Sequence, residues 1–207
     1  MIVELRQPHA VAVRPDAPRG MPVACSILCT DIAGFGDPRR DDDDRRVVRA
    51  ALYGMLRDVL AASDVPWERC LHEDRGDGTL SVVPPDVPTS ALVDPLVPLL
   101  AARLRRYNRQ AGEPVRIRLR VALHAGPVAA DPYGLHGVSL IRAARLLDAP
   151  VLTERLAAAG AHLAFIASGH MYDTVIRHAV GLVDPAAYRR VRVRVKESRL
   201  TGWMYLG

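Results

Sequence analysis

Apolar runs and alternating apolar and polar positions along the chain predict four strands in its first 125 residues. The small apolar run at 23–29, VACSILC, is expected to be a buried strand. A hairpin is predicted over 67–83, with its turn at Gly76-Asp77-Gly78, because Asp-Gly is a residue pair that such turns favour. At 117–123 apolar residues alternate with arginines, which is the period of a strand with one buried face.

Apolar residues at helical spacing predict two helices in the same half. The first follows the acidic tract Asp41–Asp44, and carboxylates there complement the helix dipole, so we interpret the tract as a solvated cap and not as a metal site. The second helix is predicted over 89–110, with Pro95 and Pro98 near its start, where missing backbone donors matter least. The buried side of the first helix would carry Val48, Leu52, Met55, Leu56 and Val59.

The second half of the chain reads as short helices and strands. The strand at 117–123 is expected to end at His124-Ala125-Gly126, and Gly134–Gly137 to form a loop that enters a helix. The elements predicted after it are helices over 138–147, 152–159 and 171–178, a strand over 162–167, and a closing hairpin of 191–196 and 203–206. Together they predict an α+β fold, a mixed sheet with helices packed against it.

Length and charge narrow the class of protein. The 207 residues suffice for one well-packed domain, which we place at 22–207, after a leader at 1–21 that carries three prolines and could add an edge strand. Lys and Arg exceed Asp and Glu by 28 to 23, and the excess is spread along the chain, so binding to nucleic acid is not required. We expect no nucleic-acid partner.

The cysteines and the hydropathy favour a cytoplasmic protein. Cys25, Cys29 and Cys70 lie in apolar surroundings without the Cys and His spacing of a zinc site, so they are interpreted as reduced core residues. No apolar run approaches the roughly 20 residues that span a bilayer, and the N-terminus has no signal-peptide core. We therefore expect no membrane partner.

Two acidic turns contain the candidate functional residues of the chain. Asp31 follows the apolar run at 23–29, and Asp77 lies in the turn of the predicted hairpin, so both aspartates belong to strand ends. Divalent cations such as Mg2+ and Mn2+ prefer carboxylate oxygens and leave positions open for phosphates. The pair therefore indicates metal-dependent nucleotide chemistry, although Asp31 taken alone is better explained as a helix cap and Asp77 taken alone as a plain turn.

The other polar residues of the predicted strands have structural interpretations. His72 and His124 are interpreted as sheet residues with satisfied hydrogen bonds. Arg118, Arg120, Arg192 and Arg194 would form solvated or interfacial sides of strands. An RNA-binding face is the weaker alternative, because aromatic residues do not interleave with these arginines.

Five motifs follow one another with a characteristic order and spacing. They are Leu28–Phe35, Gly76–Gly78, Val121–Val128, Gly137–Arg145 and Val195-Lys196. In this order they resemble the catalytic domain of class III nucleotidyl cyclases, the adenylate and guanylate cyclase family, over roughly residues 22–206. The departures described below are those of a divergent or degenerate bacterial member.

The resemblance implies a fold, an assembly and a reaction. It implies a ferredoxin-like core and a head-to-tail homodimer with two composite sites across the subunit interface. In the implied reaction, the ribose 3′-hydroxyl of a nucleoside triphosphate attacks its own α-phosphate. The products are a 3′,5′-cyclic monophosphate and pyrophosphate.

The resemblance also implies roles for individual residues. Asp31 and Asp77, with the backbone of Ile32, would hold two divalent cations, Mg2+ or Mn2+. The backbone of Ile32, Ala33, Gly34 and Phe35 would meet phosphate oxygens, since Gly34 permits close approach. Arg145 would stabilise charge on the α-phosphate, and Lys196 would neutralise the terminal phosphates.

In this resemblance, one position implies which base of the nucleotide the protein recognises. Glu73 stands four residues before Asp77, where adenylate cyclases of the family carry lysine and guanylate cyclases carry glutamate. A carboxylate accepts hydrogen bonds from guanine N1 and N2, and it can also accept from the amino group of cytosine. GTP is therefore the favoured substrate and a pyrimidine triphosphate the next, while the second base-reading position falls near Gly134, which has no side chain.

The largest departure from the family pattern is Ile141. It stands four residues before Arg145, where the family usually has asparagine, and an apolar side chain cannot orient the ribose or the phosphate. Ser139 or Arg142 would be substitutes if the helix were shifted. The alternative function is therefore a cyclase-homology domain that binds nucleotide, or a regulatory protein partner, without turnover.

Overall fold

The structure is a computed structural model that describes residues 21–207. The predicted leader at 1–21, with its edge strand, lies outside the described residues except for Met21. The described strands form an eight-stranded sheet in the order β2-β3-β1-β4-β6-β8-β7, with β5 paired to β4. Only the β4–β6 pair is parallel among these pairings. The strands are β1 Val23–Ile32, β2 Leu71–Asp74, β3 Gly78–Val83, β4 Leu119–Asp131, β5 Gly134–His136, β6 Leu163–Ser168, β7 Arg189–Val195 and β8 Ser198–Leu206.

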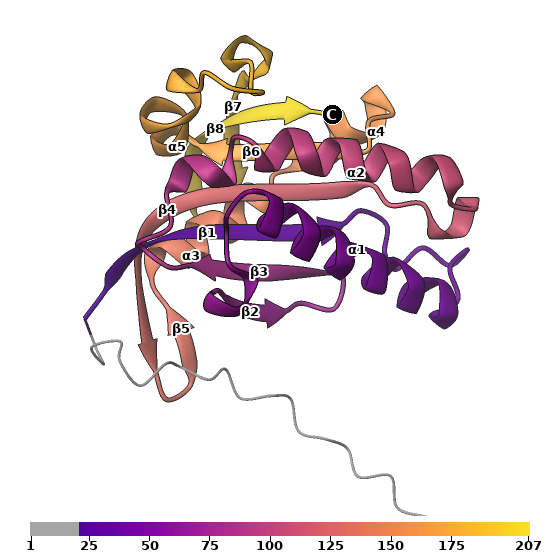
Figure 1. Ribbon diagram of the computed structural model, residues 1–207, viewed down its shortest axis with the longest axis horizontal. Helices are drawn as coiled ribbons and strands as arrows, with labels where there is room; N and C mark the ends of the chain where they lie inside the picture. Colours follow the sequence, from indigo (N-terminus) through magenta and orange to yellow (C-terminus); the bar gives the residue numbers. More distant parts are fainter. Residues whose placement is uncertain (1–20) are drawn as a thin grey trace, which may run out of the picture.

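Helices cover both faces of this sheet, as Figure 1 shows. Side chains alternate between the faces, so Leu28 and Ile32 of β1 pack under α1 and α2, while Ile27 and Cys29 belong to the second core, with α3 and α4. The fold is therefore α+β, as the sequence predicts. The helices are α1 Asp42–Ala62, α2 Leu96–Gln110, α3 Val138–Leu147, α4 Pro150–Ala159 and α5 Gly169–Thr174, with 3-10 turns at Trp67–Arg69, Thr89–Leu92, Glu113–Val115, Ile176–His178 and Pro185–Ala187.

The acidic tract at 41–44 caps α1. Asp41 Oδ1 accepts from the Asp44 amide at 2.8 Å, and Asp44 Oδ2 accepts from the Asp41 amide at 3.2 Å, which is a reciprocal capping box. Three carboxylates lie in the first turn, where the helix dipole favours negative charge. The interpretation of the tract as a cap is confirmed.

The second predicted helix is shorter in the structure than 89–110. Residues Thr89–Leu92 form a 3-10 turn, and α2 begins at Leu96. The reason is Pro95, because a proline disfavours the helical conformation of the residue before it. The helix predicted over 171–178 is likewise divided, into α5 and the 3-10 turn at Ile176–His178.

The strand predicted to end at 124–126 ends several residues later, so this predicted boundary is wrong. β4 continues through Gly126 and Pro127 to Asp131, because β1 pairs with it as far as Val128 and β5 pairs with its last residues. Gly134–His136, predicted as loop, is the strand β5. The β4–β5 hairpin extends beyond the rest of the sheet (Figure 1).

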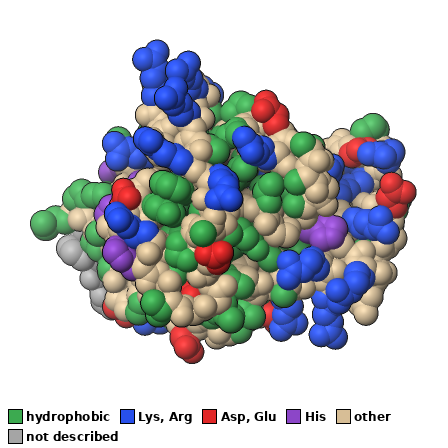
Figure 2. All heavy atoms as spheres, turned by 90° about the horizontal axis from the view of Figure 1, so that it is seen from above, with side chains coloured by type: hydrophobic (Ala, Val, Ile, Leu, Met, Phe, Trp, Pro, Cys, Tyr) green, Lys and Arg blue, Asp and Glu red, His purple; other side chains and the backbone are tan. Residues whose placement is uncertain are grey.

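Three further features of the described residues are their hydropathy, their surface charge and the state of their cysteines. Within residues 21–207, no helix has both the length and the apolar character that a bilayer crossing requires. Figure 2 shows Lys and Arg side chains in several separate groups on the face that it draws. All three cysteines are free thiols, and burial raises the pKa of Cys29 to about 12 and that of Cys70 to about 11.

Candidate functional site

The two acidic turns meet at one end of the sheet. β1 and β3 pair so that Asp31 lies opposite Gly78, and the Ile32 amide donates to the Asp77 carbonyl at 2.8 Å. The carboxylate of Asp77 is also close enough to that of Asp31 to raise its pKa. The structure therefore brings together the two aspartates that lie 46 positions apart in the sequence.

Burial and one arginine set the electrostatics of Asp31. Burial is the largest cause that raises its pKa, the contact with Asp77 raises it further, and Arg120 opposes both. Arg120 Nε donates to Asp31 Oδ2 at 2.7 Å, and Nη1 of the same guanidinium donates to Thr153 of α4 at 2.8 Å. Both contacts of the Arg120 guanidinium with Asp31 go to Oδ2. A cation at Asp31 would therefore bind the other carboxylate oxygen, Oδ1.

The carboxylate pair fits a divalent cation in its chemistry. Two carboxylates in contact repel each other when both are ionised, and a cation between them removes that repulsion. Among residues 21–207 no group of three or more His, Cys, Asp or Glu side chains could hold a metal ion. A cation here would therefore have two carboxylates from this chain and take its other ligands from backbone, water or phosphate.

The turn that carries Asp77 is held by α1. Arg49 donates to Asp74 Oδ1 at 3.1 Å and also to the Gly76 carbonyl, and the Gly76 amide donates to the same Asp74 oxygen at 2.8 Å. Gly76 has φ +85°, a conformation that glycine adopts without steric cost. Sequence reasoning missed Arg49, since nothing in the α1 pattern indicates a contact with a turn 25 residues away.

The loop after Asp31 has few free backbone donors. The amides of Ile32, Ala33 and Phe35 donate to carbonyls of Asp77, Arg118 and Ile32, respectively. In the segment 32–35, Gly34 is therefore the residue whose amide is available to a phosphate. Its φ of +68°, with open space where a Cβ would stand, fits close approach by a ligand. The loop predicted to bind phosphate through four residues thus offers one amide in this arrangement.

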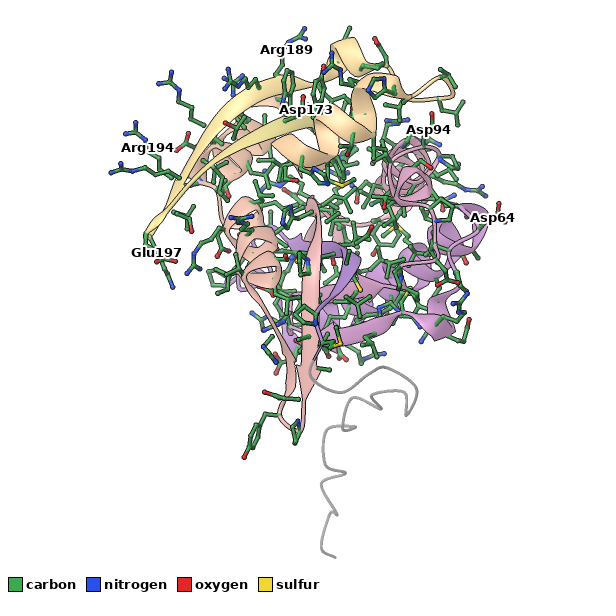
Figure 3. The ribbon with its side chains drawn as sticks, turned by 90° about the vertical axis from the view of Figure 1, so that its left-hand side faces the viewer. Asp64, Asp94, Asp173, Arg189, Arg194 and Glu197 are labelled. Atoms are coloured by element: carbon green, nitrogen blue, oxygen red, sulfur yellow. The ribbon has the colours of Figure 1, made fainter. Side chains whose placement is uncertain are left out.

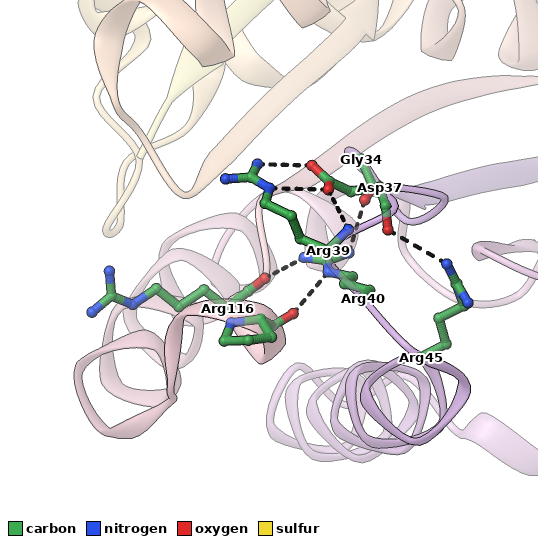
Figure 4. Close-up of polar contacts among 7 residues, drawn as sticks. Gly34, Asp37, Arg39, Arg40, Arg45 and Arg116 are labelled. Carbon is green, nitrogen blue, oxygen red and sulfur yellow. Dashed lines mark hydrogen bonds and ion pairs between the residues drawn. The ribbon is translucent and has the colours of Figure 1, made fainter.

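Arg40 holds this loop against the 3-10 turn Glu113–Val115 and the residue after it, as Figure 4 shows. Its guanidinium donates to the carbonyls of Pro114 at 2.8 Å, Arg116 at 2.6 Å and Gly34 at 3.2 Å. In the same loop, Arg39 and Asp37 form a bidentate ion pair, with Nη2–Oδ2 at 2.8 Å. The loop conformation therefore depends on arginine contacts that the sequence pattern did not indicate.

Glu73 lies on the same face of the sheet as Asp31. It pairs with Leu80, whose side chain belongs to the core under α3 and α4, and opposed residues of an antiparallel pair share a face. Arg75 Nη2 donates to Glu73 Oε2 at 2.6 Å. The candidate base-reading carboxylate therefore already has a cationic neighbour from its own hairpin.

Arg145 and Lys196 form a second group. Arg145, in the last turn of α3, contacts Glu197, which follows Lys196 in the turn between β7 and β8. Within the part of the chain that the structure describes, no hydrogen bond or ion pair joins this group to Asp31 or Asp77. The single chain thus holds the candidate site residues as two separate groups.

Ile141 is exposed on α3, and its neighbours do not replace it. Its exposed fraction is 49%, one turn before Arg145. Ser139 is buried, and a Cβ on Gly126 would lie 2.4 Å from its Oγ, so it faces the sheet and cannot serve a ligand on the outer side of α3. The idea that Ser139 substitutes for the family asparagine is therefore wrong, while Arg142 is exposed.

The two strand histidines differ in their hydrogen bonds. His72 has partners for both ring nitrogens, Ser81 Oγ at 2.7 Å and the Trp67 carbonyl at 3.1 Å. His124 Nδ1 lies 2.9 Å from Ser168 Oγ, but its buried Nε2 has no partner among the described residues. The interpretation as a satisfied sheet residue is confirmed for His72 and is half wrong for His124.

His124 is expected to make the protein less stable in acid. Burial lowers its pKa from 6.5 to about 4, and Arg142 and His170 add to the effect. The folded state thus keeps the ring neutral, so stability is fully present above pH 6.5 and is lost as the pH falls through 6.5 towards 4. Between pH 7 and pH 4, the Tm of the wild type should fall more than that of His124→Asn. Parallel Tm profiles would contradict this assignment.

Comparisons with known proteins identify the fold. No protein-family description and no curated protein sequence matches the chain. Among solved structures, the guanylyl cyclase Cya2 has a TM-score of 0.60 at 16% identity, over 90% of this chain and 94% of that one. An adenylate/guanylate cyclase/hydrolase from Silicibacter pomeroyi has a TM-score of 0.62 at 14% identity, over 90% and 98%.

A third solved structure contains a nucleotide. The guanylate cyclase domain of RhGC from Catenaria anguillulae, in complex with GTP, has a TM-score of 0.57 at 15% identity, over 89% of this chain and 96% of that one. The chain therefore has the fold of the class III adenylate and guanylate cyclase catalytic domains, over nine-tenths of its length.

Proposed function

We propose that the protein is a nucleotidyl cyclase that converts a nucleoside triphosphate to a 3′,5′-cyclic monophosphate and pyrophosphate. The observation that carries the proposal is the pairing of β1 with β3, which brings the buried Asp31 next to Asp77 at one end of a cyclase-fold sheet. Burying two mutually repelling carboxylates costs free energy, so a bound cation is the simplest reason for the arrangement.

The proposed chemistry divides between cations and side chains. Divalent cations, two Mg2+ or Mn2+ ions held by Asp31, Asp77 and the Ile32 backbone, would supply charge neutralisation and a lower pKa for the 3′-hydroxyl. The 3′-oxygen forms a bond to the α-phosphorus, the bond from that phosphorus to the bridging oxygen of pyrophosphate breaks, and the hydroxyl proton leaves to solvent. Arg145 stabilises the negative charge that develops on the α-phosphate, and Lys196 binds the terminal phosphates.

The two separate groups of residues support a dimer. Because no hydrogen bond or ion pair joins Asp31 or Asp77 to Arg145 or Lys196 within the described residues of one chain, a complete site would combine the first group of one protomer with the second group of another. We therefore propose a head-to-tail homodimer with two composite sites. Its face would include the exposed apolar side chains Val138 and Ile141 of α3.

GTP is the proposed substrate, and a pyrimidine triphosphate is the next candidate. Glu73 accepts from the N1 and N2 donors of guanine, while the neighbouring Arg75 can donate to a base carbonyl such as O6. Glu73 lies on the same face of the sheet as Asp31, because its partner Leu80 belongs to the core under α3 and α4.

The test is a direct assay of cyclic products. The purified protein would be incubated with GTP, CTP, UTP or ATP and with Mn2+ or Mg2+, and the products analysed by mass spectrometry. Cyclic GMP as the main product would support the proposal in full. A cyclic pyrimidine nucleotide would support the proposed reaction and correct the proposed substrate. The absence of any cyclic product would refute the proposal that the protein is a cyclase.

A second function is favoured by Ile141. A cyclase-homology domain that binds nucleotide or a regulatory protein without turnover would tolerate an apolar residue in place of the family asparagine. It predicts saturable, metal-dependent nucleotide binding in calorimetry with no cyclic product. Activity that disappears in Arg145→Ala would refute this alternative.

The substitution Ile141→Asn is expected to increase turnover. An amide at this exposed position of α3 can donate to the ribose or phosphate, and one added transition-state hydrogen bond corresponds to roughly a tenfold higher kcat. Val180→Asn, at an exposed apolar position outside α3, is the control for added polarity and should leave kcat unchanged. If both variants have wild-type kcat, position 141 does not face the substrate.

A further inference from the structure

The guanidinium of Arg145 is held in an unusual state. Its side chain is only 16% exposed, and Nη2 donates to Glu197 Oε1 at 3.1 Å. Its Nε is buried and has no acceptor within residues 21–207. A buried donor without an acceptor costs free energy, because the hydrogen bond to water has been lost and not replaced. Glu197 is thus the acidic side chain that holds this guanidinium.

The backbone of the β7–β8 turn places Glu197 next to Lys196 in the chain and within reach of Arg145. Lys196 has a left-handed conformation, φ +50°, which closes the tight turn between the paired residues Val195 and Ser198. Figure 3 shows Glu197 at the tip of this hairpin, with Arg194 further along the same strand pair. α3 packs against β7 and β8, so the tip of the hairpin reaches the end of the helix that carries Arg145.

From this geometry we propose that Glu197 is a positioning residue for Arg145. It binds one terminal nitrogen of the guanidinium and fixes the plane of that group beside Lys196. The arrangement keeps the two cationic side chains, those of Arg145 and Lys196, together for one polyanionic ligand. This role rests on the proposed function, in which Arg145 meets the α-phosphate and Lys196 the terminal phosphates.

An ordinary surface ion pair is the simplest other explanation. Glu197 is 69% exposed, and exposed pairs contribute little to stability. That explanation does not account for the enclosed Nε of Arg145, because a surface pair leaves the arginine free to turn its nitrogens to water. Asp148 and Glu154, acidic residues near the same helix ends, form no ion pair with Arg145.

The first test measures the guanidinium without any nucleotide. In 15N NMR spectra, the Nε proton of Arg145, assigned by its loss in Arg145→Lys, should exchange slowly with water in the wild type. In Glu197→Ala it should exchange about tenfold faster, and in Glu197→Gln, which keeps the acceptor oxygen, it should stay close to the wild type. Glu154→Ala, on the exposed side of α4, is the control. Unchanged exchange in Glu197→Ala would overturn the proposal.

The second test adds ligand and separates this inference from the proposed function. Inorganic pyrophosphate should shift the Nε resonance of Arg145 in the wild type and less in Glu197→Ala. If the wild type forms a cyclic nucleotide, Glu197→Ala should lower kcat about tenfold with little change in KM, and Glu197→Gln should restore most of it. If it forms none, the proposed function fails, whereas the exchange and pyrophosphate shifts still decide the role of Glu197. Equal pyrophosphate shifts in both proteins would refute that role.

Discussion

Asp31→Asn is expected to abolish cyclic-nucleotide formation, with a loss of at least about a hundredfold in kcat. Asparagine has nearly the same shape and keeps an oxygen for Arg120, so the β1–β4 pairing and the fold should persist. What disappears is the negative charge that, together with Asp77, would hold a divalent cation. The measurement is product formation with Mn2+, together with the increase in Tm that Mn2+ produces in the wild type.

The control for this prediction is Asp42→Asn. Asp42 is a fully exposed carboxylate in the first turn of α1, and it pairs with Arg45. Removing it changes the net charge by the same amount, so activity and the Mn2+ effect on Tm should remain. If Asp31→Asn kept both the Mn2+ effect and turnover, the carboxylate pair would not be a metal site, and the proposed reaction would lose its main support.

Gly78→Ala is expected to cause the largest loss of stability, about 3 kcal/mol or more. A Cβ at this position would lie 1.8 Å from the Thr30 carbonyl oxygen and 2.6 Å from its carbon, both backbone atoms of β1. Neither can move without breaking the β1–β3 pairing, in which Gly78 lies opposite Asp31. Urea denaturation gives the free energy of unfolding, and an unchanged m value would show that the loss is one of stability.

Two other glycines provide matched controls. A Cβ on Gly36 would meet no atom within 4 Å, so Gly36→Ala should change stability by less than about 0.5 kcal/mol. Gly76 also has open space but has φ +85°, so Gly76→Ala should cost about 1 to 2 kcal/mol from backbone strain alone. If Gly78→Ala were as stable as Gly36→Ala, the close approach of β3 to β1 would be wrong.

Local periodicity predicted most elements because it depends on neighbours in the chain. The strand at 23–29 and the helix after Asp44 follow from side chains that repeat every two or 3.6 residues, and both are in the structure as β1 and α1. The same reasoning failed at β4, since its extension through Gly126 and Pro127 depends on pairing with β1, about 100 residues earlier. Pairing of this kind is not visible in a local pattern.

The candidate site divides in the same way. The identities of Asp31, Asp77, Glu73, Arg145 and Lys196 as site residues were predicted from motif order. Three arginine or glutamate contacts were not predicted, because each comes from another element: Arg120 of β4 binds Asp31, Arg49 of α1 binds the turn that carries Asp77, and Glu197 of the last hairpin binds Arg145. Likewise, only hydrogen-bond partners reveal that three amides of the loop 32–35 are already occupied.

The amino-acid sequence by itself determined most of the segments that form strands and helices, the faces that they bury, and the position of two carboxylates at strand ends. Those properties follow from short-range periodicity and turn chemistry. The tertiary structure decided that Asp77 lies close enough to Asp31 to raise its pKa. It also decided that Arg145 forms a hydrogen bond with Glu197 in a separate group. Strand register and helix packing set these contacts, and both arise from burial between segments far apart in the chain.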